Sequence, residues 1–128
     1  MAAGEIVVEV SDGARRVRAW CRWVGEDLVV AVGGGERPHV GCVVLAQSRP
    51  STREPGLLSV SSSVLTIPPH KEEPVARGIA ERLARELGCT VVTTAGIHDD
   101  GLGAAGARGY LDLAGRLADD LLATLRGR

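Results

Sequence analysis

The chain has 128 residues and a formal net charge of −1, so its size is that of one domain and its charge gives no strong field of either sign. Nonspecific binding to nucleic acid depends on neutralising phosphates with excess Lys and Arg, and it is therefore not expected. Apolar residues make up 45% of the chain, but Phe is absent and aromatic residues are only 2%, so the core must come from aliphatic side chains.

These bounds predict a single domain over residues 1–128. A small core with little aromatic volume often gains stability by pairing with a second copy, so we expect a homodimer. Cys21, Cys42 and Cys89 lie in apolar stretches without CxxC spacing, which predicts reduced core residues. The N-terminus has no signal-peptide pattern and no apolar run approaches membrane-spanning length, so we expect a cytoplasmic protein without membrane contact.

In the first half of the chain, side-chain character alternates with a period of two, which is typical of strands. A strand is predicted over residues 5–10, and the Asp12-Gly13 pair predicts a hairpin turn before a second strand over 16–23. One face of this second strand is apolar and the other is mostly basic. The apolar face carries Val17, Ala19, Cys21 and Trp23, and the other carries Arg16, Arg18, Trp20 and Arg22.

Further strands are predicted over 28–32 and 40–46, separated by a break at 33–38, so the first four strands would form a meander. A polar loop at 48–55 then leads to a strand over 57–67.

The second half changes to a helical period. After Pro68-Pro69, apolar residues recur at three- and four-residue steps, with Pro74 suited to the first helical turn and Gly88 to the C-terminal cap. A short buried strand over 91–95, a loop over 96–103 and a closing amphipathic helix follow. The apolar stripe of that helix consists of Tyr110, Leu113, Leu117, Leu121 and Leu125.

Together these elements predict the α+β class, with a single mainly antiparallel sheet of about six strands and two helices packed on it. The face of the sheet without helices would either stay in contact with water or pack against the same face of a second copy.

All three histidines stand at breaks between elements. His39 is predicted to open a strand, His70 lies between a strand and a helix, and His98 follows a buried strand. Histidine titrates near neutral pH and is the commonest metal ligand, so this placement suggests a site. Isolated histidines without short-range ligand spacing are more often surface or cap residues, and both interpretations stay open.

Two loops carry the other candidate residues. His70, Lys71 and Glu72 precede a helix N-terminus. Either Glu72 and Glu73 only complement the helix dipole and Lys71 is solvated, or His70 and Lys71 approach a ligand phosphate or an acidic ring substituent. The loop at 98–100 places an imidazole beside two carboxylates, which can bind a cation, hold a histidine tautomer or form an ordinary turn.

The basic stripe formed by Arg16, Arg18 and Arg22 beside Trp20 resembles nucleic-acid-binding or phosphate-binding surfaces. A single aromatic residue is too few for a stacking platform. We therefore interpret the stripe as a solvated strand face or part of a dimer contact.

Three segments, Arg37-Pro38-His39-Val40-Gly41, Pro69-His70-Lys71-Glu72 and Ala95-Gly96-Ile97-His98-Asp99-Asp100, occur in this order. Together they resemble the LpdD-like family of prenylated-flavin chaperones, which are accessory subunits of UbiD-type decarboxylases of hydroxyaryl acids. The resemblance extends from about the third strand to the last loop.

The resemblance implies a fold akin to proteasome-assembly chaperones, a homodimer, and a role in binding prenylated FMN or FMN and delivering or maturing it for a UbiD-type decarboxylase. It implies no catalytic residue, because a carrier binds and releases its cofactor. The implied cofactor-binding residues are His39, His70, Lys71, Glu72, His98 and Asp100. If the three histidines converge, His39, His70 and His98 could hold a divalent metal.

Two other functions remain open from the sequence. The same histidines and carboxylates could serve a small metal-dependent enzyme. Alternatively, the protein could be an assembly chaperone that acts through its sheet face.

Overall fold

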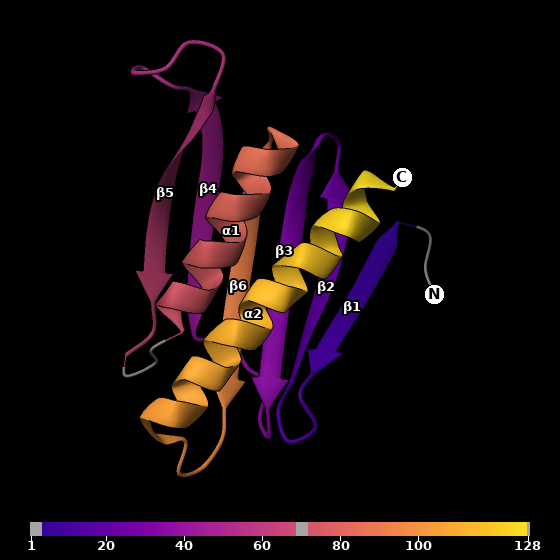
Figure 1. The fold of residues 1–128 in the computed structure, drawn as a ribbon, viewed down its shortest axis with the longest axis vertical. Coiled ribbons are helices and arrows are strands. Elements are labelled where there is room, and N and C mark those ends of the chain that lie inside the picture. Colours follow the sequence, from indigo (N-terminus) through magenta and orange to yellow (C-terminus); the bar gives the residue numbers. More distant parts are fainter. Residues whose placement is uncertain (1–3, 69–71, 128) are drawn as a thin grey trace.

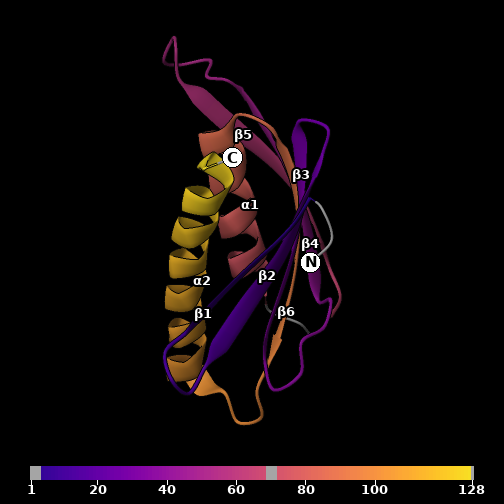
Figure 2. The ribbon, with the colours of Figure 1, turned by 90° about the vertical axis from the view of Figure 1, so that its right-hand side faces the viewer.

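The computed structural model describes residues 4–68 and 72–127. These residues form one six-stranded sheet and two helices, which confirms the predicted α+β class. Both helices lie on the same face of the sheet and leave the other face open (Figures 1 and 2).

The elements follow the chain in the order of five strands, a helix, a strand and a helix. They are β1 (Glu5–Ser11), β2 (Arg16–Val24), β3 (Asp27–Gly35), β4 (Cys42–Pro50), β5 (Leu58–Thr66), α1 (Glu73–Leu87), β6 (Thr90–His98) and α2 (Gly103–Arg126).

The strand order in the sheet is β1-β2-β3-β6-β4-β5. The predicted meander of the first four strands is therefore wrong after β3, because β6 lies between β3 and β4. The β3–β6 pair is parallel, and all other pairs of neighbouring strands are antiparallel. The chain leaving β3 must therefore cross the end of β6 before it begins β4.

The predicted alternation on β2 is confirmed. Val17, Ala19 and Cys21 are buried beneath the helices, while the intervening residues of β2 are exposed. The core consists mainly of Val, Leu, Ile and Ala, as the composition predicts, and Tyr110 is its one buried aromatic side chain among the described residues. Cys21 and Cys42 are buried in it, and Cys89 is half-buried.

Helix α1 begins and ends where its sequence signals predict. Pro74 lies in the first turn, and Gly88 adopts a left-handed conformation at φ 66° and donates its N–H to the Ala84 carbonyl. The second half differs from prediction at two places, because β6 continues to His98 and α2 already begins at Gly103. The loop predicted over 96–103 is therefore only the short link between them.

The strands around the predicted break at 33–38 also differ from expectation. Gly33, Gly34 and Gly35 continue β3, and β4 begins at Cys42 and runs to Pro50. His39 consequently lies in the connection between β3 and β4, which we call the crossing loop (residues 36–41), and does not open a strand. No helix within the described ranges is long and apolar enough to cross a membrane.

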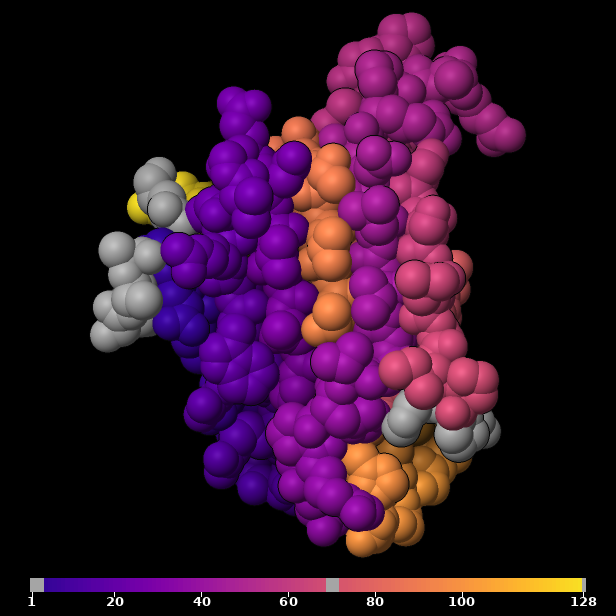
Figure 3. Space-filling view, turned by 180° about the vertical axis from the view of Figure 1, so that it is seen from behind, coloured from indigo at the N-terminus to yellow at the C-terminus, as the bar shows by residue number. Residues whose placement is uncertain are grey.

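Figure 3 shows the face of the sheet that the helices leave open. A row of mostly apolar residues crosses all six strands on this face. Strand register places its members side by side. The row consists of Val7, Trp20, Ala31, Thr94, Val43 and Leu65, and Val29, Val92 and Leu45 lie beside it. We call this set the apolar row, and several of its side chains, including that of Leu65 at 74%, are exposed.

Candidate functional site

The predicted site residues that the structure describes lie at one edge of the sheet. Because β3 and β6 are parallel, their carboxyl ends meet at this edge, and ligands commonly bind outside the carboxyl ends of parallel strands. The crossing loop and the N-terminus of α1 lie at the same edge (Figure 1). We call this region the site edge.

The crossing loop is held tightly against β6. The N–H of His39 donates to the Gly96 carbonyl at 3.4 Å, and the N–H of Gly41 donates to the Ala95 carbonyl at 3.0 Å. A Cβ on Gly96 would lie 1.7 Å from the His39 carbonyl oxygen, so no residue with a side chain fits there without moving the loop. Glycine at this position therefore fixes the His39 backbone over the end of β6.

His39 and Glu72 form a pair that joins the crossing loop to the start of α1. The Nε2 of His39 lies 3.1 Å from Oε1 of Glu72, a residue that is only 8% exposed. The other ring nitrogen, Nδ1, lies 3.0 Å from the carbonyl oxygen of Arg37. Since both ring nitrogens face oxygen atoms, a doubly protonated imidazolium would donate a hydrogen bond at each.

Glu72 also reaches the backbone of β6. Its Oε1 accepts the N–H of Ile97 at 3.4 Å, at a point on β6 beyond the last residue that pairs with β4. One buried carboxylate thus links the start of α1, the crossing loop and β6, and its partner Ile97 is next in sequence to His98.

A second group on the site edge consists of Arg37, His98 and Asp100. A terminal nitrogen of Arg37 lies 2.7 Å from Nε2 of His98 and donates to Oδ1 of Asp100 at 2.8 Å. The same histidine nitrogen lies 3.1 Å from that carboxylate oxygen. Because Nε2 accepts from Arg37 only when it carries no proton, and donates to Asp100 only when it does, the group can exchange one hydrogen bond for the other.

The charges of this second group are exposed. The hydrogen bond from His98, followed by the charge of Arg37, lowers the pKa of Asp100 below its ordinary value. Solvent weakens such exposed pairs, so they contribute little to stability and their side chains can turn towards a ligand.

Behind these residues, Asp99 holds the site edge to the core. Its carboxylate accepts the N–H of Glu36 at 2.7 Å and the hydroxyl of Tyr110 on α2. Burial of Tyr110, followed by its hydrogen bond to Asp99, raises the pKa of the phenol above its ordinary value. Tyr110 therefore keeps its proton and remains a donor to Asp99 at physiological pH.

Of the predicted site residues, the structure places His39 in contact with Glu72 and His98 in contact with Asp100. Arg37 contacts the second pair through its side chain and the first through its carbonyl group. The sequence analysis did not name Arg37 as a site residue, although it belongs to the segment that carries His39. His70 and Lys71 lie outside the described residues.

A metal site is not formed by the described residues alone. Across 4–68 and 72–127, no group of three or more His, Cys, Asp and Glu side chains could hold a metal ion. The imidazoles of His39 and His98 instead contact protein groups, as given above. The metal site predicted for His39, His70 and His98 also includes a residue outside the described part of the chain.

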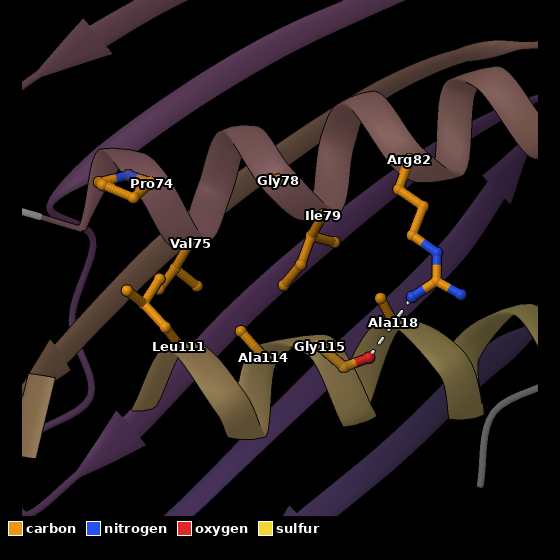
Figure 4. Close-up of a pocket in the computed structure, with 9 residues that line it drawn as sticks. All are labelled: Pro74, Val75, Gly78, Ile79, Arg82, Leu111, Ala114, Gly115 and Ala118. Atoms are coloured by element: carbon orange, nitrogen blue, oxygen red, sulfur yellow. Dashed lines mark hydrogen bonds between the residues drawn. The ribbon is translucent and has the colours of Figure 1, made fainter. Parts of the chain in front are cut away.

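A groove of about 240 Å³ lies elsewhere, between α1 and α2 (Figure 4). Its walls are mostly apolar or small, and Arg82 at one end donates to the Gly115 carbonyl at 3.5 Å. None of the predicted site residues lines it.

Comparison with known proteins supports the fold and identifies the family. No curated protein matches the chain. A solved structure described as a novel chaperone complex for yeast 20S proteasome assembly is 16% identical, with a TM-score of 0.55 over 94% of each chain, which supports the fold alone.

The family described as the prenylated flavin chaperone LpdD-like domain matches residues 11–126, which is nearly the whole chain. This match confirms the resemblance predicted from the three sequence segments. The chain therefore belongs to the prenylated flavin chaperone LpdD-like family.

Proposed function

We propose that the protein binds prenylated FMN, or FMN, at the site edge and delivers or matures it for a UbiD-type decarboxylase. Family membership supports the cofactor class. The observation that carries the proposal is the contact of His39 with the buried carboxylate of Glu72, beside His98 on the neighbouring strand. Bound prenylated FMN would supply its decarboxylation chemistry to the partner enzyme, so this chain needs only to hold and release it.

The donors of the site edge fit a flavin nucleotide. Such a ligand has an anionic phosphate and a ring edge with hydrogen-bond acceptors and a donor, and the guanidinium of Arg37 and the imidazole of His98 provide matching groups. Both ring nitrogens of His39 already contact protein oxygens, so His39 contributes by ordering the crossing loop. Glu72 fixes His39, whereas Arg37, His98 and Asp100 are exposed and can exchange their mutual hydrogen bonds for bonds to a ligand. His70 and Lys71, which the family resemblance assigns to the same site, are included in the proposal.

An exposed site suits a carrier better than a closed catalytic pocket. A carrier must release its ligand, and exposed charge pairs that contribute little to stability are easily replaced. We infer that no residue of the chain performs catalysis.

The test is a titration of the purified full chain with reduced prenylated FMN and with FMN under anaerobic conditions, followed by absorbance and calorimetry. His39→Ala and Glu72→Gln should weaken flavin binding at least about tenfold, as expected for loss of a charge-assisted hydrogen bond. Glu73→Gln is the matched control, because Glu73 is adjacent in sequence but pairs with Arg77 along α1. His70→Ala and Lys71→Ala test the remaining predicted residues, and repeating the titration with a chelator tests the metal.

Transfer is measured by adding the loaded protein to an apo UbiD-type decarboxylase and following the appearance of decarboxylase activity. Failure of the wild-type protein to bind either flavin would contradict the proposal, as would equal binding by folded His39→Ala and Glu72→Gln variants. Turnover of a hydroxyaryl acid by the isolated chain would instead favour an enzyme.

We also propose that the protein is a homodimer in which the apolar rows of two copies face each other. With both helices on one face, the other face exposes apolar side chains on several neighbouring strands. Contiguous apolar surface of this kind marks interaction sites, and two sheets commonly pack face to face. The same surface would serve a protein-assembly chaperone, which captures another protein in place of a second copy.

A further inference from the structure

A separate hollow of about 200 Å³ opens at the end of β3, beside the crossing loop. Strand register places Glu9, Arg18 and Gly33 in one row across β1, β2 and β3 on the open face. The lining residues of the hollow are Glu9, Arg16, Arg18, Gly33, Gly34, Gly35 and Pro38. We call it the arginine hollow.

Gly33 has no side chain, whereas Glu9 and Arg18, its neighbours in register on β1 and β2, carry long charged ones. A Cβ on Gly33 would lie 2.9 Å from the Cβ of Pro38, so Pro38 packs directly over this glycine. Pro38 lines the hollow together with the charged side chains of Glu9, Arg16 and Arg18.

The charged side chains of the arginine hollow are only partly used within the protein. Arg18 donates from two nitrogens to Oε1 of Glu9, at 2.9 and 2.8 Å. The Nε of Arg16 lies 3.8 Å from the other oxygen of Glu9, too far for a hydrogen bond, and its side chain is 69% exposed. The guanidinium groups of Arg16 and Arg18 and the carboxylate of Glu9 together carry a net charge of +1.

Arg18 is also held in place by an aromatic ring. The centre of its guanidinium lies 5.6 Å from the centroid of Trp20, within the range of a cation–π contact. Together, Glu9 and Trp20 fix Arg18, whereas the side chain of Arg16 makes no hydrogen bond within the described part of the chain. An incoming anion would therefore find one fixed and one adjustable guanidinium.

We propose that the arginine hollow binds a single phosphate group. The guanidinium fork matches phosphate oxygens in a bidentate geometry, and Arg16 has this fork available. The volume of about 200 Å³ leaves room for a phosphate group and water around it. Glu9 restricts the excess charge to one, which disfavours a polyphosphate chain.

The phosphate has two possible sources. Pro38 lines the hollow and precedes His39 in the crossing loop, so the phosphate of a flavin nucleotide held at the site edge is one source. Free inorganic phosphate is the other. Only the first depends on the proposed function.

The site is tested by titrating the full-length protein with inorganic phosphate and recording amide NMR shifts of Gly33–Gly35 and the indole shift of Trp20. Arg16→Gln should weaken phosphate binding at least about tenfold, the usual effect of losing a charge-assisted hydrogen bond. Arg22→Gln is the matched control, because Arg22 lies on the same face of β2 but pairs with Glu5 and Val29, away from the hollow. The absence of a saturable response, or equal weakening by both variants, would overturn the proposal.

The source is identified by comparing FMN with riboflavin, which lacks the phosphate. If the cofactor phosphate occupies the hollow, wild-type protein binds FMN at least about tenfold more tightly than riboflavin, and Arg16→Gln removes the difference. If inorganic phosphate binds in an Arg16-dependent way while FMN does not bind, free phosphate is the ligand and the proposed flavin function fails alone. If flavin binds but Arg16→Gln changes neither phosphate nor FMN affinity, the arginine hollow fails alone.

Discussion

The Oε1 of Glu72 lies 3.1 Å from Nε2 of His39 and also accepts the N–H of Ile97. This contact connects a helix start, a loop and a strand that are far apart in sequence. Because Glu72 is buried, its carboxylate needs the polar groups that the crossing loop and β6 provide, and those groups need the carboxylate. The same contact sets the orientation of the His39 ring before any ligand binds.

Replacing Glu72 with Ala should therefore destabilise the protein. Loss of a buried acceptor leaves the N–H of Ile97 and the ring of His39 without this oxygen, at a cost of about 2 kcal/mol in the free energy of unfolding. Glu73→Ala should cost less than about 1 kcal/mol, because its pair with Arg77 is an ordinary i,i+4 contact on α1. Urea unfolding of both variants measures the difference, and equal costs would show that burial of Glu72 is unimportant.

Gly96→Ala should disturb the crossing loop. The new methyl group would meet the His39 carbonyl, so we expect a loss of about 1–3 kcal/mol in unfolding free energy together with weaker flavin binding. Gly78→Ala is the opposite control, because a Cβ there has open space and alanine favours the helix by about 0.5–1 kcal/mol. Thermal unfolding distinguishes the two, and a stabilised Gly96→Ala variant would contradict the close packing of the loop.

The stability of the protein should fall as the pH rises above about 9. Burial raises the pKa of Cys21 from 9.0 to about 12, so the unfolded chain loses this proton before the folded chain does. A raised pKa gives stability that is fully present below pH 9.0 and is lost as the pH rises towards 12, at up to about 1.4 kcal/mol per pH unit.

Urea unfolding between pH 8 and pH 10 tests this prediction, with Cys21→Ala expected to flatten the dependence. Cys89→Ala is the control, since its thiol is only half-buried and should contribute a smaller slope of the same sign. If the unfolding free energy of Cys21→Ala falls with pH as steeply as that of the wild type, groups other than Cys21 cause the loss of stability at alkaline pH.

Leu65→Lys should weaken the proposed dimer. Leu65 lies at one end of the apolar row and is largely exposed in the single chain, so a lysine there should leave the fold intact but place a charge in the interface. We expect the dissociation constant of the dimer to rise at least about tenfold, measured by analytical ultracentrifugation. Leu57→Lys, in an exposed loop outside the apolar row, should leave the dissociation constant unchanged. If the wild-type protein is a monomer at high concentration, the proposed dimer interface is wrong.

Local signals in the sequence predicted the elements but not their neighbours. Pro74 and Gly88 fixed the limits of α1 because each suits only one helix position, and the alternation around Cys21 correctly separated the two faces of β2. The insertion of β6 between β3 and β4 was not predictable in this way, because alternation shows which face is buried and not which strand lies beside it.

The residues of the site were predicted, but their contacts were not, because these contacts also depend on which segments lie side by side. His39 and Glu72 were both selected because they stand near element ends, but their contact depends on the crossing loop passing over Gly96. Gly33–Gly35 were interpreted as a break because glycine usually interrupts strands. Here they continue β3, since Gly33 lies beneath Pro38 with no space for a side chain.

The central position of β6 also affects how the protein can fold during synthesis. Strands β1 to β3 can form hairpins as they leave the ribosome, but Leu28 must wait for Val91 before the middle of the sheet closes. Pairing between such distant residues is slow, because a long loop of chain must first be closed. Until then, β4 and β5 form a detached hairpin with an unpaired edge, so the nascent chain is most prone to aggregate just before its last quarter emerges.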